Sequence, residues 1–306
     1  MTLALISHPD CSLHQTVSYH PETAERLTAI HDQLLASGLE MILHQYQAPL
    51  VTREQLQRVH DSNYLDDIFH KLDDQEQAWL DADTLMMQGT LAAARRAAGA
   101  VVEAVELVMQ DRHQIAFCAV RPPGHHAERD KAMGFCLFNN IAVGAAHALQ
   151  QWGVSKLAVI DFDAHFGNGT EQMFADNEQV MICSCFQHPF YPGCGQPSYD
   201  GHIINVPLAA GAGGAELKAG VEQHWLPALE KFEPELILIS AGFDGHREDD
   251  MSELELVEED YAWLSEQIKA VADRYAGGRI VSVLEGGYAL SALGRSVVAH
   301  LKALLG

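Results

Sequence analysis

The stretch that decides the fold is Val159-Ile160-Asp161-Phe162-Asp163-Ala164-His165-Phe166-Gly167-Asn168-Gly169-Thr170. It continues an apolar run over residues 157–160, which is short and rich in branched side chains, as a buried strand is. Two aspartates and a histidine follow at alternate positions, and two glycines then end the regular structure. Open α/β sheets place their ligands outside the carboxyl ends of the strands. The stretch therefore predicts a buried strand that leads directly into a site.

Two interpretations of this strand end are open. Carboxylate oxygens together with an imidazole nitrogen suit a zinc ion and leave room for a solvent molecule. Alternatively, the aspartates cap the end of the strand by accepting hydrogen bonds from loop amides. The stretch alone does not decide between them, and the rest of the chain favours the metal site.

Composition limits the classes of partner. The chain has 306 residues, of which 48% are hydrophobic, so it can bury a substantial core. Its 19 basic and 42 acidic side chains give a formal net charge of −23, which argues strongly against a nucleic-acid partner. This acidity is compatible with attracting a cationic substrate, but solubility or a salty habitat explains it equally well.

Neither the N-terminus nor the cysteines indicate secretion. The first residues lack the basic region and the apolar run of a signal peptide, and no stretch approaches the ~20 apolar residues of a membrane span. We therefore expect no membrane partner. The six cysteines do not form the pattern of a disulfide framework, and none of them makes a CxxC pair. These features predict a reduced, cytoplasmic protein.

Strands and helices alternate along the chain. The pattern predicts strands at 3–8, 116–120, 157–160, 180–185, 203–206, 236–240 and 280–284. It predicts helices at 20–37, 54–71, 91–109, 139–151, 215–232 and 257–275. Such alternation indicates βαβ units and a parallel sheet with helices on both faces. Because we find no internal repeat and no Pro/Ser-rich linker, we expect residues 1–306 to form a single domain.

Four of the predicted strands end in polar side chains. Because parallel strands share one direction, these ends should meet at one edge of the sheet. Two carboxylates and one imidazole could bind a metal that activates water, and a histidine could transfer the proton. A tyrosine hydroxyl could donate a hydrogen bond to the developing oxyanion. The side chains at these ends are His125, His126, Asp163, His165, Asp244 and Tyr288.

Each of these residues also has a structural explanation. Asp244 could be a turn or cap residue, and the Gly-Gly-Tyr at 286–288 could be a tight turn with a packed aromatic ring. Adjacent histidines in a strand would face opposite ways, although the irregular backbone after Pro-Pro-Gly could turn His125 and His126 toward one pocket. We expect Arg121 to be a structural salt-bridge partner rather than a catalyst.

Five blocks, in order, resemble the signature blocks of the histone deacetylase family, which includes the acetylpolyamine amidohydrolases. Together with residues 20–27 they cover nearly the whole chain. The blocks are Arg-Pro-Pro-Gly-His-His-Ala at 121–127, Gly-Phe-Cys-Leu-Phe-Asn-Asn at 134–140, Asp-Phe-Asp-Ala-His-Phe-Gly-Asn-Gly-Thr at 161–170, Ser-Ala-Gly-Phe-Asp at 240–244 and Glu-Gly-Gly-Tyr at 285–288.

The resemblance implies an arginase–deacetylase-like fold, with an open parallel sheet of about eight strands and helices on both faces. It also implies one catalytic Zn²⁺ and a hydrolase that acts on linear amides. The implied zinc ligands are Asp163, His165 and Asp244. The implied catalytic residues are His125, His126 as the general base and acid, Asp161 behind His125, Asn168 behind His126, and Tyr288 as the oxyanion donor.

The resemblance also implies residues around the substrate. The expected substrate-binding residues are Asp83 at the rim, Phe135 and Tyr191 as the walls of an acyl-lysine tunnel, Gly134 and Gly286. Arg26 would line an inner product channel. Asp161 and Ser184 fall where family members bind a structural monovalent cation, K⁺ or Na⁺.

Details of the blocks indicate a place within the family. Asn168 resembles the asparagine of class II enzymes at a position where class I enzymes have Asp. Tyr288 is the residue of active subtypes, whereas subtypes with His there are poor deacetylases. A two-metal arginase site would need another Asp two residues after His165, and that position is Gly167.

The substrate depends on the register of the acidic run at 248–253. Some polyamine-selective relatives place an acidic gatekeeper a few residues after the last zinc-binding Asp. An ungapped count puts Met251 there, which favours acyl-lysine, but a slip of one residue puts Asp250 there. We favour a deacylase acting on lysine in peptides or proteins. An acetylpolyamine or other small-amide hydrolase is the second hypothesis, and a non-catalytic acyl-lysine reader is the third. The oligomeric state stays open.

Overall fold

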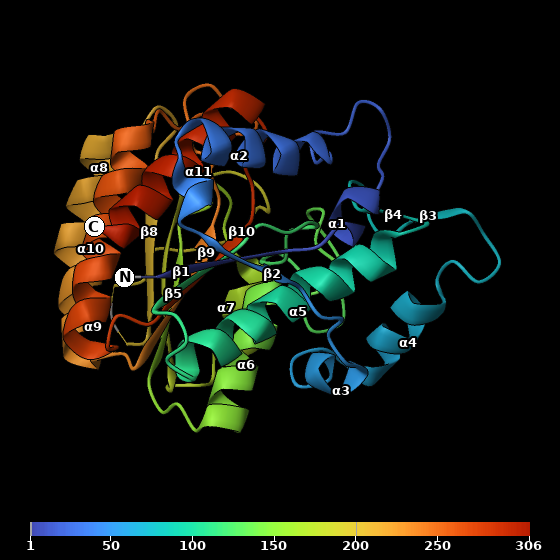
Figure 1. The fold of residues 1–306 in the computed structure, drawn as a ribbon, viewed down its shortest axis with the longest axis horizontal. Coiled ribbons are helices and arrows are strands. Elements are labelled where there is room, and N and C mark those ends of the chain that lie inside the picture. The colour runs from blue at the N-terminus through green and yellow to red at the C-terminus, as the bar shows by residue number, and fades with distance from the viewer. Residues whose placement is uncertain (1, 200) are drawn as a thin grey trace.

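A computed structural model describes residues 2–199 and 201–306 and contains one parallel sheet of eight strands (Figure 1). The strands are β1 (Leu3–Ser7), β2 (His44–Gln47), β5 (Ile115–Cys118), β6 (Leu157–Asp161), β7 (Val180–Gln187), β8 (Ile203–Leu208), β9 (Leu236–Ala241) and β10 (Ile280–Leu284). Their order is β2-β1-β5-β10-β9-β6-β7-β8, and every neighbouring pair is parallel. The predicted parallel sheet of about eight strands is confirmed.

Strands that are neighbours in the sheet are often far apart in the sequence. β10, the last strand in the sequence, lies between β5 and β9, and hydrogen bonds join it to both. β6 lies on the other side of β9. The four strands whose ends carry the predicted site residues are therefore consecutive at the centre of the sheet.

Helices cover both faces of the sheet (Figure 1). One face packs against α5 (Thr90–Met109) and α6 (Asn140–Trp152), and the other against α2 (Glu25–Ala36), α10 (Glu258–Tyr275) and α11 (Leu290–Leu305). Successive strand residues point to opposite faces, so Leu157 and Val159 join the first core while Ala158 and Ile160 join the second. This two-sided burial explains why the central strands are apolar throughout.

The remaining elements are short. A two-stranded antiparallel hairpin, β3 (Gln77–Trp79) and β4 (Leu85–Met87), lies outside the main sheet. A 3₁₀ turn spans Leu39–Met41 and a π-helical turn spans Val221–Trp225. The other helices are α1 (Asp10–Leu13), α3 (Arg53–Leu56), α4 (Ser62–His70), α7 (Asn168–Phe174), α8 (Gly214–Gly220) and α9 (Leu226–Phe232).

The predicted bounds of two helices differ from those in the structure. The helix expected from residue 20 begins at Glu25, because the buried His20 and Glu22 bond to distant groups instead of starting a helix. The helix expected over 54–71 is two helices, interrupted at 57–61. There the buried His60 bonds to the carbonyl of Glu128 and accepts from the N–H of Asn139. In both cases tertiary hydrogen bonds override a helical pattern.

The helix expected over 215–232 is also interrupted. Residues 221–225 form a π-helical turn, in which the N–H of Leu226 donates to the carbonyl of Val221 five residues earlier. Pro227 follows directly and has no N–H to continue the usual α-helical ladder. The segment is therefore α8, the π-helical turn and α9 in succession.

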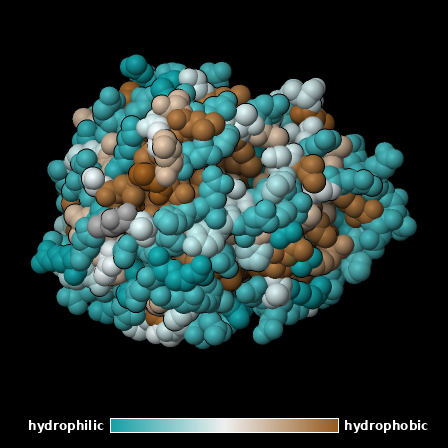
Figure 2. All heavy atoms as spheres, viewed as in Figure 1, coloured by the Kyte–Doolittle hydropathy of each residue, from teal (hydrophilic) through white to brown (hydrophobic). Residues whose placement is uncertain are grey.

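The surface and the cysteines agree with the composition. On the face shown in Figure 2, hydrophilic side chains predominate and hydrophobic ones lie in small patches between them. Within residues 2–199 and 201–306, no helix is long and apolar enough to cross a membrane. All six cysteines are free thiols, and five of them are buried. The expectation that they form no disulfide framework is confirmed.

Candidate active site

The carboxyl ends of β5, β10, β9 and β6 meet at one edge of the sheet, because these four strands are neighbours and run in the same direction. The loops that follow these strands carry the six polar residues that the sequence singled out. The structure brings these six residues, His125, His126, Asp163, His165, Asp244 and Tyr288, to this edge.

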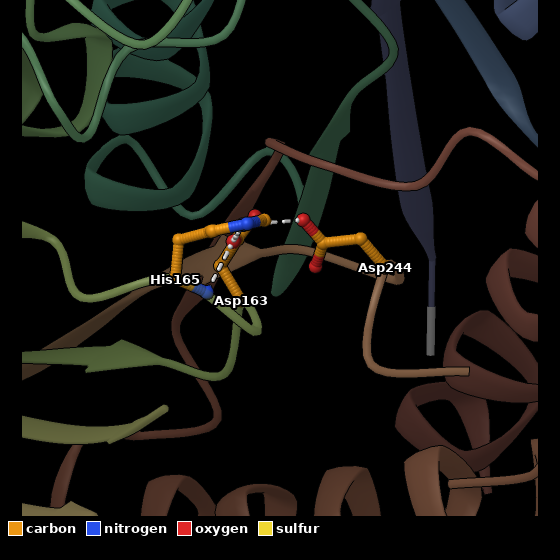
Figure 3. A group of neighbouring side chains, drawn as sticks. All are labelled: Asp163, His165 and Asp244. Carbon is orange, nitrogen blue, oxygen red and sulfur yellow. Dashed lines mark hydrogen bonds and ion pairs between the residues drawn. The ribbon is translucent and has the colours of Figure 1, made fainter. Parts of the chain in front are cut away.

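Asp163, His165 and Asp244 form a buried cluster of possible metal ligands (Figure 3). One donor atom of each residue lies within 4.8 Å of the others. The Nδ1 atom of His165 is 3.1 Å from Oδ1 of Asp163 and 2.9 Å from Oδ2 of Asp244. Two carboxylates and one imidazole, from the loops after β6 and β9, thus converge on a common centre.

The backbone holds the second oxygen of each carboxylate. The N–H of Gly286 donates to Oδ2 of Asp163 at 2.8 Å, and the N–H of Ala164 donates to Oδ1 of Asp244 at 2.9 Å. A Cβ atom at position 286 would lie 2.2 Å from Oδ2 of Asp244 and 2.6 Å from Oδ2 of Asp163. Only glycine permits this close approach of the backbone to both carboxylates.

The electrostatics and the donor set of this cluster fit a divalent cation. Burial and the neighbouring Asp163 carboxylate raise the pKa of Asp244 to about 6. Burial also opposes the charge of Asp163, but His125 and His165 hold its pKa below the ordinary value. A bound cation would offset both the repulsion between the carboxylates and the cost of burying them. Two carboxylates and one imidazole suit zinc with an open ligand position.

The tandem histidines point into the same space rather than to opposite sides. Both line the same cavity, and their ring centroids are 4.1 Å apart. Nδ1 of His125 is 3.0 Å from Oδ2 of Asp161, and Nδ1 of His126 is 2.8 Å from Oδ1 of Asn168. One imidazole is therefore paired with a carboxylate and the other with a neutral amide.

These partners separate the charge states of the two imidazoles. Burial opposes a charge on His125, but the carboxylates of Asp163 and Asp161 raise its pKa to about 10. Burial and the neighbouring His125 and His165 lower the pKa of His126 well below its ordinary value. The surroundings thus shift the pKa values of the two adjacent imidazoles in opposite directions.

Glu285 supports the tandem histidines and was not predicted. Its Oε2 atom accepts hydrogen bonds from the N–H of Gly124 at 2.7 Å and the N–H of His125 at 3.1 Å. The Ser240 hydroxyl donates to its other oxygen at 3.1 Å. Burial raises the pKa of Glu285 to about 7. A buried acid directly after an apolar strand was the available sequence signal.

Tyr288 is fixed through its backbone and its ring. Its N–H donates to Oδ2 of Asp249 at 2.6 Å, and the N–H of Ala289 donates to the same atom at 2.9 Å. The guanidinium of Arg26 lies 4.8 Å from the centre of the Tyr288 ring. Asp249 is buried and was not predicted, because it is one of several acids in the run at 248–253.

A cavity of about 270 Å³ opens from the metal cluster to the surface. We call its most buried part the floor, formed by His125, His126, Asp163 and His165, which are at most 7% exposed. We call its outer part the mouth, formed by Asp83, Tyr191, Asp250 and Met251, which are half-buried or exposed. The other lining residues are Pro123, Gly134, Phe135, Phe190, Gly286 and Tyr288.

All five residues expected at the substrate lie on this cavity. The Phe135 ring meets the Tyr288 ring edge to face at 5.9 Å. Gly134 has a positive φ of 56°, and a Cβ there would lie 2.4 Å from the His126 ring. Oδ1 of Asp83 accepts from the N–H of Gly134 at 3.1 Å, so this carboxylate already has one backbone partner.

Two aromatic side chains form the wall beside the metal cluster. Phe190 stacks on the His165 ring with the centroids 5.4 Å apart, and this residue was not predicted. Tyr191 meets the His126 ring edge to face at 5.1 Å. Phe190 and Tyr191 are adjacent in a loop without regular structure, so neither periodicity nor spacing could show that both rings line the cavity.

The acidic run at 248–253 contributes two residues to the mouth. Met251, the gate residue by the ungapped count, is half-buried and lines the cavity. Asp250, the residue given by a slip of one, also lines it and is exposed. Asp249 points inward to the Tyr288 backbone instead. Both alternatives therefore lie within reach of a substrate at the mouth.

Asp161 and Ser184 face each other in neighbouring strands, as register partners of β6 and β7. The hydroxyl oxygen of Ser184 is buried and has no hydrogen-bond partner among the residues that the structure describes. Oδ1 of Asp161 accepts from the N–H of Asp163 at 3.1 Å. A buried oxygen without a partner beside a carboxylate fits the donor set of a monovalent cation.

Arg26 and Arg121 belong to a buried charge network behind the floor. Arg26 donates from Nε to the carbonyl of Gly287 at 2.6 Å and from Nη1 to Oε1 of Glu22 at 3.2 Å. Arg121 donates from Nη2 to Oε2 of Glu22 at 2.7 Å. Arg121 is thus a structural salt-bridge partner, as expected. Arg26 contacts the ring of Tyr288 but does not line the cavity.

Comparisons with known proteins identify the family of the chain. The family model for the histone deacetylase domain matches residues 20–304. The chain is 36% identical to "Histone deacetylase-like amidohydrolase" from Pseudomonas aeruginosa, over 88% of this chain and 71% of that protein. It is 35% identical to "Polyamine deacetylase HDAC10" from Mus musculus, over 100% of this chain and 48% of that protein.

A solved structure, that of the HDA15 HD domain, matches with a TM-score of 0.92 and 32% identity, covering 100% of this chain and 90% of that one. The chain spans only 20% of the length of one curated relative, "Type-2 histone deacetylase 2" from Dictyostelium discoideum, and 99% of the length of another. Membership of this family supports an amidohydrolase. The chain belongs to the histone deacetylase family.

Proposed function

We propose that the chain is a zinc-dependent amidohydrolase that removes an acetyl or other acyl group from the side-chain amine of lysine. The observation that carries the proposal is the pair of differently partnered histidines beside the Asp163–His165–Asp244 cluster on the floor of the cavity. We also propose that residues 1–306 form one catalytic domain, which the single eight-stranded sheet supports.

Asp163, His165 and Asp244 would hold the zinc ion. When bound, zinc supplies Lewis-acid polarisation of the amide carbonyl and lowers the pKa of a water molecule. The protein supplies the fixed geometry, since backbone N–H groups already hold one oxygen of each carboxylate. Such preorganised ligands lose little freedom when the metal binds.

His126 would act as the general base and then as the general acid. The oxygen of an amide can only accept, so the hydrogen bond to Oδ1 of Asn168 places the proton on Nδ1 of His126. Nε2 of His126 then keeps its lone pair. It takes a proton from the attacking water and later transfers it to the leaving amine.

His125 and Tyr288 would stabilise charge in the transition state. The carboxylate of Asp161 would keep the His125 ring oriented, and His125 lines the floor of the cavity where the amide would react. The Tyr288 hydroxyl would donate to the oxyanion that develops from the amide carbonyl. Arg26 and Phe135 contact the ring of Tyr288 from outside and thereby limit its movement.

The cavity suits an extended acyl-amine. Phe135 and Tyr191 would pack against the methylene chain, with Gly134 and Gly286 leaving room beside it, and Asp83 would accept from substrate amides at the rim. An acetylpolyamine or other small amide is the second candidate. The exposed Asp250 carboxylate at the mouth and the similarity to a protein named a polyamine deacetylase favour it.

Two further proposals concern the surroundings of the enzyme. Asp161 and the unpartnered Ser184 hydroxyl support a structural K⁺ or Na⁺ between β6 and β7. The six free thiols support a reducing, cytoplasmic location. The acidic composition supports the absence of a nucleic-acid partner.

The test is hydrolysis of an acetyl-lysine peptide and of N-acetylputrescine, side by side, by zinc-loaded protein. We expect faster turnover of the peptide, and a loss of about a hundred- to a thousand-fold in kcat for Tyr288→Phe at unchanged zinc content. Faster turnover of the polyamine would assign the chain to the second candidate. Activity on neither, or full activity of Tyr288→Phe, would overturn the proposal.

A further inference from the structure

The amide of Asn168 could in principle face His126 in two ways. With the oxygen toward His126, the Nδ1 atom of His126 carries the proton and its Nε2 atom stays free to act as a base. With the nitrogen toward His126, Nδ1 would have to accept, and the proton of the neutral ring would move to Nε2. The orientation of one neutral side chain therefore decides whether His126 can accept a proton from water.

Glu128 is the group that sets this orientation. Its Oε1 atom lies 2.7 Å from Nδ2 of Asn168. The other neighbours of Nδ2, the His126 carbonyl and the Met133 sulfur, are both 3.4 Å away and form weaker contacts. A carboxylate can only accept hydrogen bonds, and those it accepts are stronger than neutral ones. It therefore holds the nitrogen of Asn168 on its own side and the oxygen on the side of His126.

Glu128 is itself held in place. Its second oxygen accepts from Nε2 of Gln172 at 3.2 Å. Its backbone N–H donates to the carbonyl of Lys131 at 2.9 Å, and its carbonyl is 2.9 Å from Nδ1 of His60. The buried imidazole of His60 also interrupts the helical pattern between α3 and α4, so a distant part of the chain fixes this backbone.

Glu128 lies behind the active site rather than in it. It lines a second cavity, of about 450 Å³, which also includes Asn168 and Glu171, and it is absent from the lining of the substrate cavity. The hydrogen bond to Asn168 is therefore the direct link from the Glu128 side chain to the tandem histidines.

We propose that Glu128 is a positioning residue, which selects the tautomer of His126 by orienting the Asn168 amide. This inference rests on the proposed function, because it concerns the base of that reaction. The tandem-histidine block would then extend one residue further, to Glu128, the acid that directly follows Ala127. Asn168 and Glu128 would form one functional unit, in which the amide of Asn168 supplies the donor and the carboxylate of Glu128 the acceptor.

The first test is a set of variants at the two positions. For Glu128→Ala we expect kcat to fall about ten- to a hundred-fold with KM nearly unchanged, as for other residues that orient a catalytic group. Glu128→Gln should keep most of the activity, because its amide oxygen can still accept from Asn168. Asn168→Asp should also lower kcat, because two carboxylates would then face each other.

The decisive comparison is the double variant Glu128→Gln with Asn168→Asp. Here the Gln amide can donate to the Asp carboxylate, so the double variant should exceed Asn168→Asp in kcat by about ten-fold. The effect of Glu128→Gln on kcat would thus change sign: a slight decrease in the parent protein and an increase in the Asn168→Asp background. An equal effect in both backgrounds, or full kcat for Glu128→Ala, would overturn the proposal.

Glu171→Ala is the matched control. Glu171 lines the same second cavity, is also half-buried, and accepts from an asparagine, Nδ2 of Asn205, at 2.7 Å. It has no bond to Asn168 among the residues described. We expect kcat to stay within about two-fold of the parent protein, which separates the loss of a particular hydrogen bond from a general loss of local packing.

A measurement without turnover separates this proposal from the proposed function. The ¹⁵N spectrum of histidine-labelled protein, with His126 assigned by the His126→Gln variant, reports which ring nitrogen carries the proton. We expect protonated Nδ1 in the parent protein and in Glu128→Gln, and a mixture of tautomers in Glu128→Ala. An unchanged tautomer in Glu128→Ala would overturn the proposal, even if the protein hydrolyses neither substrate.

Discussion

The floor and the mouth of the cavity are built in opposite ways. On the floor the groups hold one another: Gly286 donates to Asp163, Asp161 accepts from His125, and Asn168 accepts from His126. At the mouth, the buried hydroxyl of Tyr191 has no hydrogen-bond partner among the described residues, and Asp250 is exposed.

This difference separates two properties of the enzyme. A side chain with several fixed partners keeps one geometry, which a reaction with defined proton transfers requires. A side chain with few partners can change without disturbing its neighbours. We therefore expect substitutions on the floor to abolish the reaction, and substitutions at the mouth to change which substrate is used.

Removing a metal ligand should give the largest effect. His165→Ala removes one of the three proposed ligands, and the several kcal/mol of transition-state stabilisation that a metal supplies correspond to a loss of about a thousand-fold or more. We expect zinc per chain, measured by elemental analysis, to fall together with activity. Asp250→Asn at the mouth should leave the zinc content unchanged. Full zinc loading of His165→Ala would contradict the assignment of the ligands.

Two glycines distinguish the regions without removing any functional group. A Cβ in Gly286→Ala would press on both carboxylates, so zinc affinity should fall about ten- to a hundred-fold. Gly193, in the loop that carries Tyr191, also has a positive φ of 82°, but a Cβ there would meet nothing within 4 Å. Gly193→Ala should cost about 1 kcal/mol of stability and keep zinc. Equal zinc affinity in both variants would remove the distinction.

The imidazoles of the floor also differ in their surroundings from an imidazole in the hydrophobic core. His300 is fully buried between α10, α11 and β10, where its two ring nitrogens lie within hydrogen-bond distance of the hydroxyls of Ser265 and Ser282. Burial lowers its pKa to about 3. In the unfolded chain His300 takes up a proton as the pH falls below 6.5, whereas in the folded protein it stays neutral down to about pH 3. The free energy of unfolding is therefore unaffected by His300 above pH 6.5 and decreases below it. We expect a loss of about 2 kcal/mol in the free energy of unfolding between pH 7 and pH 5.

Urea titrations at pH 7, 6 and 5 measure this loss. His300→Gln has no group that titrates in this range, so its free energy of unfolding should depend less on pH by about 2 kcal/mol over the same interval. The comparison of the two slopes removes the contribution of all other titrating groups. Parallel slopes would show that His300 is not the group responsible.

The smallest expected effect is a change of substrate at the mouth. Met251→Glu adds a carboxylate to the lining of the cavity, where it can attract the free ammonium group of N-acetylputrescine. We expect the ratio of kcat/KM for the polyamine over the acetyl-lysine peptide to rise about ten-fold, equivalent to about 1.4 kcal/mol. Met251→Gln, which has nearly the same size and no charge, should leave the ratio unchanged. A loss of activity on both substrates would show that Met251 is needed for the reaction itself and not for the choice of substrate.

The sequence predicted the centre of the sheet better than its edges. β6 and β9 are buried on both faces and appear as apolar runs that end in polar residues. β2, with the sequence His-Gln-Tyr-Gln, lies at the edge of the sheet and is largely exposed, so no apolar run marks it. The strands that position the site were therefore the easiest to find, because burial on both faces dictates their composition.

Within the site, residues that form part of a local pattern were predictable and their supports were not. His125 and Asp163 occur in short blocks at strand ends. Glu285, Asp249 and Glu128 matter only because the fold brings them to backbone or amide groups far away in sequence, as with Glu285 and Gly124, which are 161 positions apart. No local spacing encodes such a contact, and a single acidic residue carries little information by itself.

The position of β10 between β5 and β9 has a consequence for the synthesis of the protein. During translation, β5 and β9 emerge before the strand that joins them, so the nascent chain carries two partial sheets with unpaired edges. Tyr288 emerges later still. The residues up to β9 must therefore stay soluble without a closed sheet, and the proposed site is complete only after β10 and Tyr288 have followed. A chain that ended before β10 would lack both the strand that joins the two partial sheets and Tyr288.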